Sequence, residues 1–90
     1  MSPRRSKLDI QMEVLNAVRE GVSKPTRIMY NTNMSWMPVR KILDSLVGRG
    51  LLSAIENTVG NRASRRYEIT EKGISVLKYL EGAKELVDII

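Results

Sequence analysis

Residues 24–52, KPTRIMYNTNMSWMPVRKILDSLVGRGLL, carry the most informative pattern in the sequence, that of two helices joined by a tight turn. A short helix is predicted at the start of this stretch, because Pro25 is well placed in a first turn, where its missing N–H costs little. Ile28 and Met29 should face inward from this helix. Residues 31–33, Asn-Thr-Asn, predict a turn, because Asn tolerates the left-handed backbone that reverses a chain.

A longer helix is predicted directly after this turn, with Ser35 as its N-cap. Apolar residues recur there at i, i+3, i+4 and i+7 and form one buried stripe: Val39, Ile42, Leu43 and Leu46. The opposite, solvent-facing side is then formed by Met37, Arg40, Lys41 and Asp44. Gly48 or Gly50 is expected to end the helix.

One helix is predicted before this pair, and a hairpin after it. Ser6 and Asp9 form a variant of the capping box in which a shorter acid replaces Glu. Helical spacing then continues through Ile10, Val14 and Val18. Leu51–Glu56 and Arg65–Ile69 are predicted strands, joined by a turn-rich loop at 57–64. Three arginines fall at or near the tip of this hairpin: Arg62, Arg65 and Arg66.

A long last helix is predicted from Glu71 to the end of the chain, with Thr70 as its cap. Its apolar seam consists of Val76, Leu77, Leu80, Ala83, Leu86, Val87 and Ile90. The first half should pack on the domain's own core, whereas so small a domain has little left to cover the second half. We therefore predict a homodimer through Leu80, Ala83, Leu86, Val87 and Ile90. Gly82 leaves open whether the helix continues, kinks or ends there.

Composition excludes several functional classes. The chain contains no Cys and no His, so it offers no thiolate nucleophile, imidazole base or soft metal site. No carboxylate cluster lies beside a phosphate-binding loop or a nucleophile elbow, so we expect no enzyme activity, no cofactor and no metal. No apolar run approaches the roughly 20 residues that span a bilayer, and no apolar signal core follows the basic start. A cytoplasmic protein is therefore expected.

Charge is unevenly distributed along the chain. Residues 1–66 carry twelve Lys and Arg against five Asp and Glu, whereas residues 67–90 carry three against five. Solubility explains a net charge of +5, but its segregation favours a polyanion as partner of one side. We expect residues 1–6 to form a basic arm, residues 7–80 one domain, and residues 71–90 a helix that extends partly as a dimerisation helix.

Three motifs resemble those of small archaeal winged helix-turn-helix proteins. Residues 24–35 resemble their second helix and turn, residues 43–52 their Leu-x-x-Leu-x-x-x-Gly-Leu-Ile helix exit, and residues 67–73 (YEITEKG) their Tyr-x-Leu-Thr-x-x-Gly entry to the last helix. The likeness covers about residues 7–80. That family contains predicted transcriptional regulators and abundant DNA-coating proteins, which dimerise through a C-terminal coiled-coil helix. Met37-Pro38 departs from the family, which usually has more polar residues there.

The resemblance implies an α+β, mainly α fold with a three-helix core, a two-stranded β-hairpin wing and a long C-terminal helix. It also implies DNA binding by the third helix and the wing. Arg40 and Lys41 suit base edges or phosphates, with an ordinary solvated helix face as the alternative. Ser35 suits a phosphate at the helix N-terminus. The predicted DNA-binding residues are Arg27, Ser35, Trp36, Met37, Arg40, Lys41, Arg62, Arg65 and Arg66.

These features predict sequence-specific binding of double-stranded DNA by a transcriptional regulator. The third helix would lie in the major groove, and the basic wing on the backbone or minor groove. General coating of DNA stays open as an alternative. A protein-interaction module also stays open, because the apolar run Trp36-Met37-Pro38 suits a protein partner. A small enzyme with paired carboxylates is a third class, although no such pair lies in a recognisable pocket motif.

Overall fold

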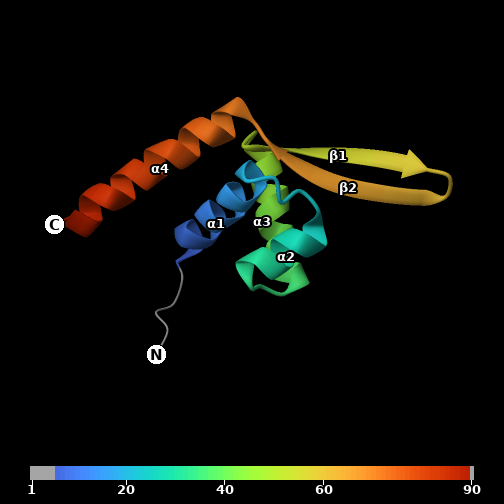
Figure 1. Ribbon diagram of the computed structural model, residues 1–90, viewed down its shortest axis with the longest axis horizontal. Coiled ribbons are helices and arrows are strands. Elements are labelled where there is room, and N and C mark those ends of the chain that lie inside the picture. The colour runs from blue at the N-terminus through green and yellow to red at the C-terminus, as the bar shows by residue number, and fades with distance from the viewer. Residues whose placement is uncertain (1–5, 90) are drawn as a thin grey trace.

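The computed structural model describes residues 6–89, which form four helices and one antiparallel hairpin. The elements are α1 (Lys7–Arg19), α2 (Pro25–Thr32), α3 (Trp36–Gly48), β1 (Leu52–Val59), β2 (Arg62–Ile69) and α4 (Glu71–Ile89). Helices α1, α2 and α3 lie together, while the hairpin and α4 project from them in opposite directions (Figure 1). The molecule is accordingly elongated, with extents of 55 × 33 × 20 Å. The predicted fold class is confirmed.

One hydrophobic core joins the helices to the base of the hairpin. Its buried members are Val14, Leu15, Val18, Ile28, Val39, Leu43, Leu46, Leu51, Leu52, Tyr67 and Leu77. The predicted stripe of α3 is buried at Val39, Leu43 and Leu46, with Ile42 half-buried at its edge. A hydrogen bond connects the hairpin to the segment between α1 and α2: the Tyr67 backbone N–H donates to the Ser23 carbonyl at 2.9 Å. The base of the hairpin is therefore fixed relative to α3.

Helix α1 begins with the predicted capping box. The Asp9 N–H donates to the Ser6 hydroxyl at 3.0 Å, and the Ser6 N–H donates to the Asp9 carboxylate at 3.2 Å. Each residue thereby satisfies a backbone donor that the first turn leaves free. The Ser6 backbone N–H is also the main reason why the pKa of Asp9 lies below its ordinary value. The predicted basic arm otherwise falls on residues 1–5, outside the described residues.

The turn between α2 and α3 is shorter than predicted. Helix α2 continues through Asn31 and Thr32, so residues 31–33 do not form the turn as a unit. Residues 33–35 join the two helices, and Asn33 has a left-handed backbone at φ 55°. Thr32 stays helical because its hydroxyl donates to the Ile28 carbonyl at 2.8 Å and is buried there.

The hairpin differs more from its prediction. Residues 57–64 do not form a loop, because the strands pair from Leu52↔Ile69 through Val59↔Arg62 and leave two residues for the turn. Gly60 occupies the first of these at φ 63°, which fits the type II′ turn that joins twisted strands. Only Arg62 therefore lies at the tip. Arg65 and Arg66 lie within β2, nearer its base.

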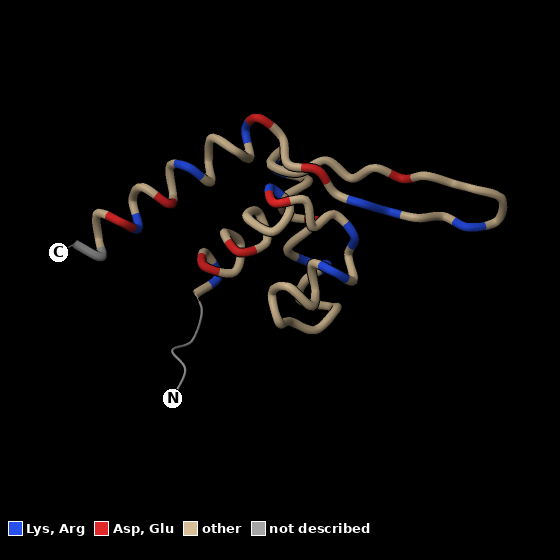
Figure 2. Tube along the Cα trace, in the orientation of Figure 1, with Lys and Arg blue, Asp and Glu red and all other residues tan. Residues whose placement is uncertain are grey.

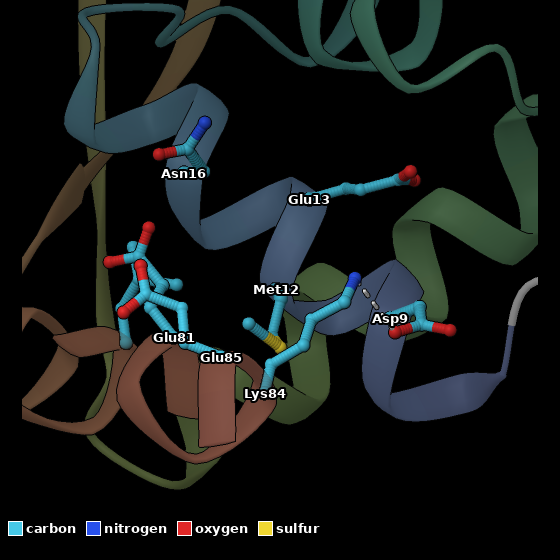
Figure 3. Close-up of a pocket in the computed structure, with 8 residues that line it drawn as sticks. Asp9, Met12, Glu13, Asn16, Glu81, Lys84 and Glu85 are labelled. Atoms are coloured by element: carbon cyan, nitrogen blue, oxygen red, sulfur yellow. Dashed lines mark ion pairs between the residues drawn. The ribbon is translucent and has the colours of Figure 1, made fainter. Parts of the chain in front are cut away.

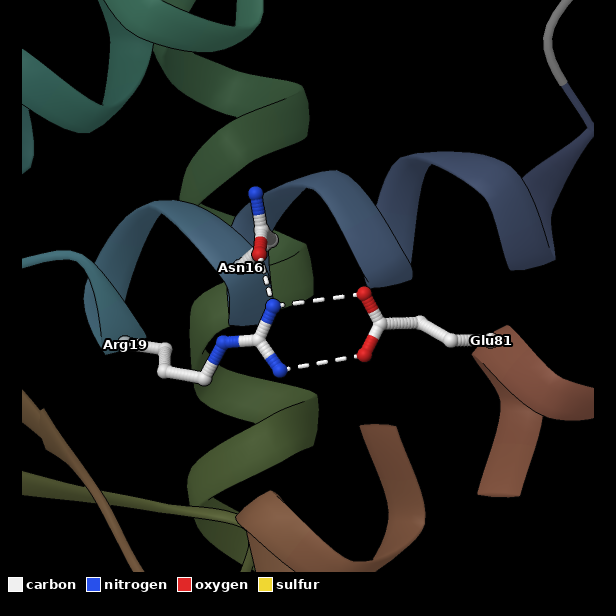
Figure 4. Close-up of polar contacts among 3 residues, drawn as sticks. All are labelled: Asn16, Arg19 and Glu81. Atoms are coloured by element: carbon white, nitrogen blue, oxygen red, sulfur yellow. Dashed lines mark hydrogen bonds and ion pairs between the residues drawn. The ribbon is translucent and has the colours of Figure 1, made fainter. Parts of the chain in front are cut away.

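Helix α4 begins against the end of α3 and then runs along α1. The Thr70 hydroxyl accepts from the Gly73 N–H at 2.9 Å, which confirms Thr70 as the cap. Gly82 neither ends nor interrupts α4. Arg19 of α1 donates to both carboxylate oxygens of Glu81, at 3.0 and 3.2 Å, and holds the two helices side by side (Figure 4). This bidentate geometry makes the pair directional.

Candidate nucleic-acid interface

The first two turns of α3 expose the face that was predicted to meet DNA. Ser35 stands at the N-cap, but its hydroxyl makes no capping hydrogen bond. Ser35 therefore occupies the predicted N-cap position, but its side chain does not form the hydrogen bond of a cap. Trp36 and Met37 are 36% and 63% exposed. Arg40 and Lys41 are exposed as well, with Arg40 Nε 3.7 Å from the Asp44 carboxylate.

Arg40 and Lys41 border different grooves. Arg40 lies with Trp36 in a cleft of about 310 Å³ between α3, the start of α2 and the hairpin. The hairpin contributes Arg65 to the same cleft. Lys41 instead lines a groove between α3 and the start of α1. Neighbours in sequence are about 100° apart around a helix of 3.6 residues per turn, so the two cations point to opposite sides of the exposed face.

The hairpin arginine in the cleft is already paired. Arg65 lies opposite Glu56 in the register, and its Nε donates to the Glu56 carboxylate at 3.0 Å. The pairing with Glu56, together with the neighbouring Tyr67, raises the pKa of Arg65 above its ordinary value. The guanidinium is therefore charged at any physiological pH, but much of its charge is balanced. Sequence reasoning missed Glu56, which lies nine residues away and meets Arg65 through strand pairing.

Two other hairpin arginines lie on the opposite face from Arg65. Arg62 and Arg66 are exposed and make no ion pair with any residue in 6–89. Arg62 lies at the tip opposite Val59, which is 79% exposed. Arg66 borders a cleft with the loop between α1 and α2. Among residues 6–89, Arg62 at the tip and Arg66 near the base of the hairpin are therefore cations without an ion-pair partner.

Arg27 lies outside the cleft that holds Arg40 and Arg65. It is exposed on α2 and shares a shallow hollow with Val22, Tyr30 and Asn31. The structure therefore does not gather all the predicted contacts into one pocket. It spreads them over α2, α3 and both faces of β2, with Arg62 and Arg66 on the face away from the cleft. This spread suits an extended partner better than a small molecule.

The side of α1 that faces α4 is rich in acidic residues. A groove between α1 and α4 is lined by Asp9, Glu13, Glu81 and Glu85, and the Lys84 ammonium lies 3.7 Å from Asp9 (Figure 3). Figure 2 shows that acidic and basic residues are mixed along α1 and α4, while the cations of the hairpin lie on β2. This groove therefore brings acids from both the predicted basic part (residues 1–66) and the predicted acidic part (residues 67–90) together, and its carboxylates would repel a polyanion.

Two further features bear on function. Within residues 6–89, no group of three or more His, Cys, Asp or Glu side chains is arranged to hold a metal ion. None of the helices in the same range is both long and apolar enough to cross a membrane.

Known proteins share the arrangement of α2, turn, α3 and hairpin. Residues 4–88 match the winged helix-turn-helix family. This chain belongs to that family. An uncharacterized protein of Methanocaldococcus jannaschii is 30% identical over 70 residues, which cover 78% of this chain and 64% of that protein. The winged helix-turn-helix chain thus spans less than two thirds of the length of this relative.

Solved structures of low identity share the winged helix-turn-helix fold. A Streptococcus mutans protein superposes with a TM-score of 0.85 at 21% identity, covering 99% of this chain and 88% of that one. BpsR of Bordetella bronchiseptica, whose DNA binding is regulated by 6-hydroxynicotinic acid, gives 0.76 at 20% identity, covering 88% and 56%. ZitR of Lactococcus lactis, a zinc-responsive MarR family member, gives 0.67 at 24% identity, covering 100% and 66%. In DNA-binding helix-turn-helix proteins, the second helix of the motif lies in the major groove.

Proposed function

We propose that this winged helix-turn-helix protein is a transcriptional regulator that binds double-stranded DNA in a sequence-specific manner. The observation that supports this proposal most directly is the cleft shared by Arg40 of α3 and Arg65 of β2. A helix that lies in the major groove would place its exposed side chains on base edges while the adjacent hairpin meets the backbone or minor groove.

Some exposed residues of α3 suit contacts with base edges, and others suit contacts with phosphates. Arg40 and Lys41 extend from the solvent-facing side and suit guanine edges or phosphates. Asp44, the one acid of α3, lies on the same side, so it suits a cytosine amino group when it is not paired with Arg40. Ser35, with its hydroxyl free of a capping bond, suits a phosphate at the N-terminus of α3. Met37 and Trp36 suit thymine methyl groups.

The remaining basic residues would contact the phosphate backbone of the DNA. Arg62 at the hairpin tip, Arg66 near its base and Arg27 on α2 suit phosphates on either side of the major-groove contact. Glu56 competes with a DNA phosphate for the Arg65 guanidinium, so Arg65 contributes less to binding unless its pair with Glu56 opens. Much of the affinity would come from released counterions and would fall steeply with salt.

A homodimer would place two copies of α3 in successive major grooves. The support for this lies on α4, where Leu86 and Val87 are 66% and 70% exposed and Leu80 and Ala83 are half-buried beside them. Apolar side chains at that density favour a partner surface. Ile90, also assigned to this contact, lies outside the described residues.

A protein-interaction role is the second candidate, and the exposure of Met37 beside Trp36 favours it. The two roles differ in their response to nucleic acid. Fluorescence anisotropy should be measured with mixed-sequence duplex DNA across a salt series, with single-stranded RNA and an acidic protein as controls. We expect salt-sensitive retention of the duplex. Absence of retention even at low salt would exclude DNA binding and favour the protein-interaction role.

The assignment of α3 is tested by the double variant Arg40→Ala with Lys41→Ala. Each lost base contact should weaken binding to a selected site by about 1–3 kcal/mol and relax the preference among bases. Lys78→Ala on α4 is the matched control, because this lysine is exposed but far along the chain from the cleft. Unchanged affinity and unchanged base preference in the double variant would remove α3 from the interface.

A further inference from the structure

The outer edge of β1 is an open strand edge. The hairpin is a sheet of two strands, so each strand has one neighbour within the sheet. Near its base, β2 gains a further contact, because the Tyr67 N–H donates to the Ser23 carbonyl. Within residues 6–89, no residue outside the hairpin forms a backbone hydrogen bond with residues 53–59 of β1. This edge of β1 is therefore a template on which another strand can pair.

The register shows which peptide groups point outward from this edge. Two residues form the turn, so the closing pair Val59–Arg62 is hydrogen-bonded, and so is every second pair from there to the base. The Thr70 N–H, which donates to the Leu51 carbonyl at 3.1 Å, continues this alternation. The residues between these pairs therefore direct their N–H and C=O groups away from β2: Ala54, Glu56 and Thr58.

The edge of β1 lacks the features by which proteins commonly prevent strand pairing. Its eight residue pairs follow one another without a bulge, and the strand contains no Pro and no Lys. Its one charged side chain is Glu56, which is already paired with Arg65 of the same hairpin. Long, regular and nearly neutral edges of this kind favour pairing with a second strand.

The side chains of β1 are complementary to a second copy of the same strand. Ile55, Asn57 and Val59 share the face away from Arg65, and Val59 is 79% exposed. In an antiparallel pair centred on Asn57, Ile55 lies opposite the partner's Val59, and the two Asn57 amides meet on the twofold axis. A pair centred on Glu56 would instead oppose two carboxylates, which is unfavourable.

The same register also satisfies the outward peptide groups. With Asn57 on the axis, Glu56 lies opposite the partner's Thr58, and Thr58 lies opposite the partner's Glu56. Both residues direct their N–H and C=O groups outward, so each of these pairs can form the two hydrogen bonds of a narrow antiparallel pair. Backbone and side chains therefore favour one register.

We infer that the edge of β1 binds β1 of a second copy of this chain, antiparallel and centred on Asn57. Two hairpins then form one four-stranded sheet through an isologous contact. So few residue pairs bury less than the roughly 1,200 Å² of a stable complex. The contact therefore forms where copies are concentrated, and it is separate from the contact proposed for α4.

The pairing has a consequence for DNA binding, which rests on the proposed function. Arg62 and Arg66 lie on β2, so they stay accessible when β1 pairs. Both arginines of both copies would then lie on one face of the four-stranded sheet, and copies that bind side by side on a duplex would be joined through their hairpins. DNA binding should accordingly be cooperative.

The first test uses the unmodified chain without DNA. Amide hydrogen exchange is measured by NMR over a series of protein concentrations. The inward N–H groups of Asn57 and Val59 should be protected at every concentration, because they are bonded to β2. We expect the outward N–H groups of Glu56 and Thr58 to exchange rapidly in dilute protein and at least severalfold more slowly in concentrated protein. Unchanged exchange at both residues up to millimolar protein would overturn the inference.

The second test fixes the register with single cysteines, because the chain contains no Cys of its own. Asn57→Cys places two thiols on the axis, in a pair whose Cα atoms lie about 4.5 Å apart and suit a disulfide. Ser64→Cys is the matched control. It is exposed on the same face opposite Asn57, but the two copies of Ser64 would lie three strand spacings apart, about 14 Å.

Under mild oxidation, Asn57→Cys should form covalent dimers about tenfold faster than Ser64→Cys, because pairing raises the local concentration of the thiols. Adding Val59→Lys should remove this difference, because an ammonium group would lie against the partner's Ile55. Val59 is exposed, so the domain should stay folded. Equal rates for the two cysteine variants, or a difference that Val59→Lys leaves intact, would refute the contact. A chain that pairs through β1 but does not retain duplex DNA would keep this inference and lose the proposed function.

Discussion

At the scale of single residues, the neighbour of each arginine determines what it can contribute to a DNA complex. Arg65 shares its charge with Glu56 across the strand pair. Arg62 has no such partner among residues 6–89 and lies at the hairpin tip. A phosphate gains most from a cation that is not already balanced, so these two arginines should differ although they lie on one strand.

This difference predicts a ranking of salt dependence. Arg62→Ala should lower the slope of log affinity against log salt by about 0.9, the value for one lost phosphate contact. Arg65→Ala should lower it by clearly less, and Glu56→Gln should raise affinity because it frees Arg65. Anisotropy titrations of all three variants across one salt series measure these effects. An equal loss in Arg62→Ala and Arg65→Ala would contradict the ranking.

At the scale of elements, two glycines of α4 are in opposite environments. Gly73 is buried, and a Cβ placed there would lie 2.1 Å from the Leu51 carbonyl oxygen and 2.8 Å from Ile69 Cγ1. Gly82 is exposed, and apart from its chain neighbours and its own helix backbone no atom lies within 4 Å of such a Cβ. The close approach at Gly73 is what allows α4 to begin directly against the end of α3. Gly82 has no comparable packing reason.

The same substitution should therefore have opposite effects at the two positions. Gly73→Ala should lower the free energy of unfolding by about 1–3 kcal/mol or more, because a backbone atom must move. Gly82→Ala should raise it by up to about 1 kcal/mol, because alanine favours a helix interior. Urea denaturation followed by circular dichroism measures both. A stabilised Gly73→Ala variant would refute the close contact between α4 and Leu51.

At the scale of the whole molecule, α4 both closes the domain and carries apolar surface beyond it. Its inner side is held to α1 by Arg19–Glu81 and Lys84–Asp9, while Leu86 and Val87 remain exposed. The ion pairs are partly or largely exposed and contribute little stability individually, but they orient the helix. The exposed apolar side chains are therefore presented in a defined direction, as an interface requires.

Dimerisation can be tested without harming the domain. Leu86→Glu combined with Val87→Glu should convert a dimer to a monomer, because two charges would enter an apolar contact. The fold should persist, since these side chains are 66% and 70% exposed in the single chain. Sedimentation velocity reports the oligomeric state, and Lys78→Ala serves as the control. Unchanged sedimentation of the double variant would show that α4 does not form the contact.

Much of the fold could be predicted from the sequence because its signals are local. Periodic apolar residues predicted α3 and its buried side, and Ser6 and Thr70 were correctly identified as caps. The hairpin loop at 57–64 was predicted too long. Asn57, Thr58 and Ser64 are common in turns, yet here they pair between strands. Composition reports the preferences of single residues, whereas strand pairing depends on the partner chosen across the turn.

The order of the elements, the buried stripe of α3 and the set of charged candidates all follow from the amino-acid sequence. Which of those candidates act together depends on how the chain folds. Folding paired Arg65 with Glu56, separated Arg40 from Lys41 into two grooves, and placed the acids of α1 and α4 on one face. The two kinds of interaction act over different distances along the chain. Caps and helix periodicity act within a few residues, whereas a charge is balanced, exposed or shared according to neighbours that folding brings from elsewhere in the chain.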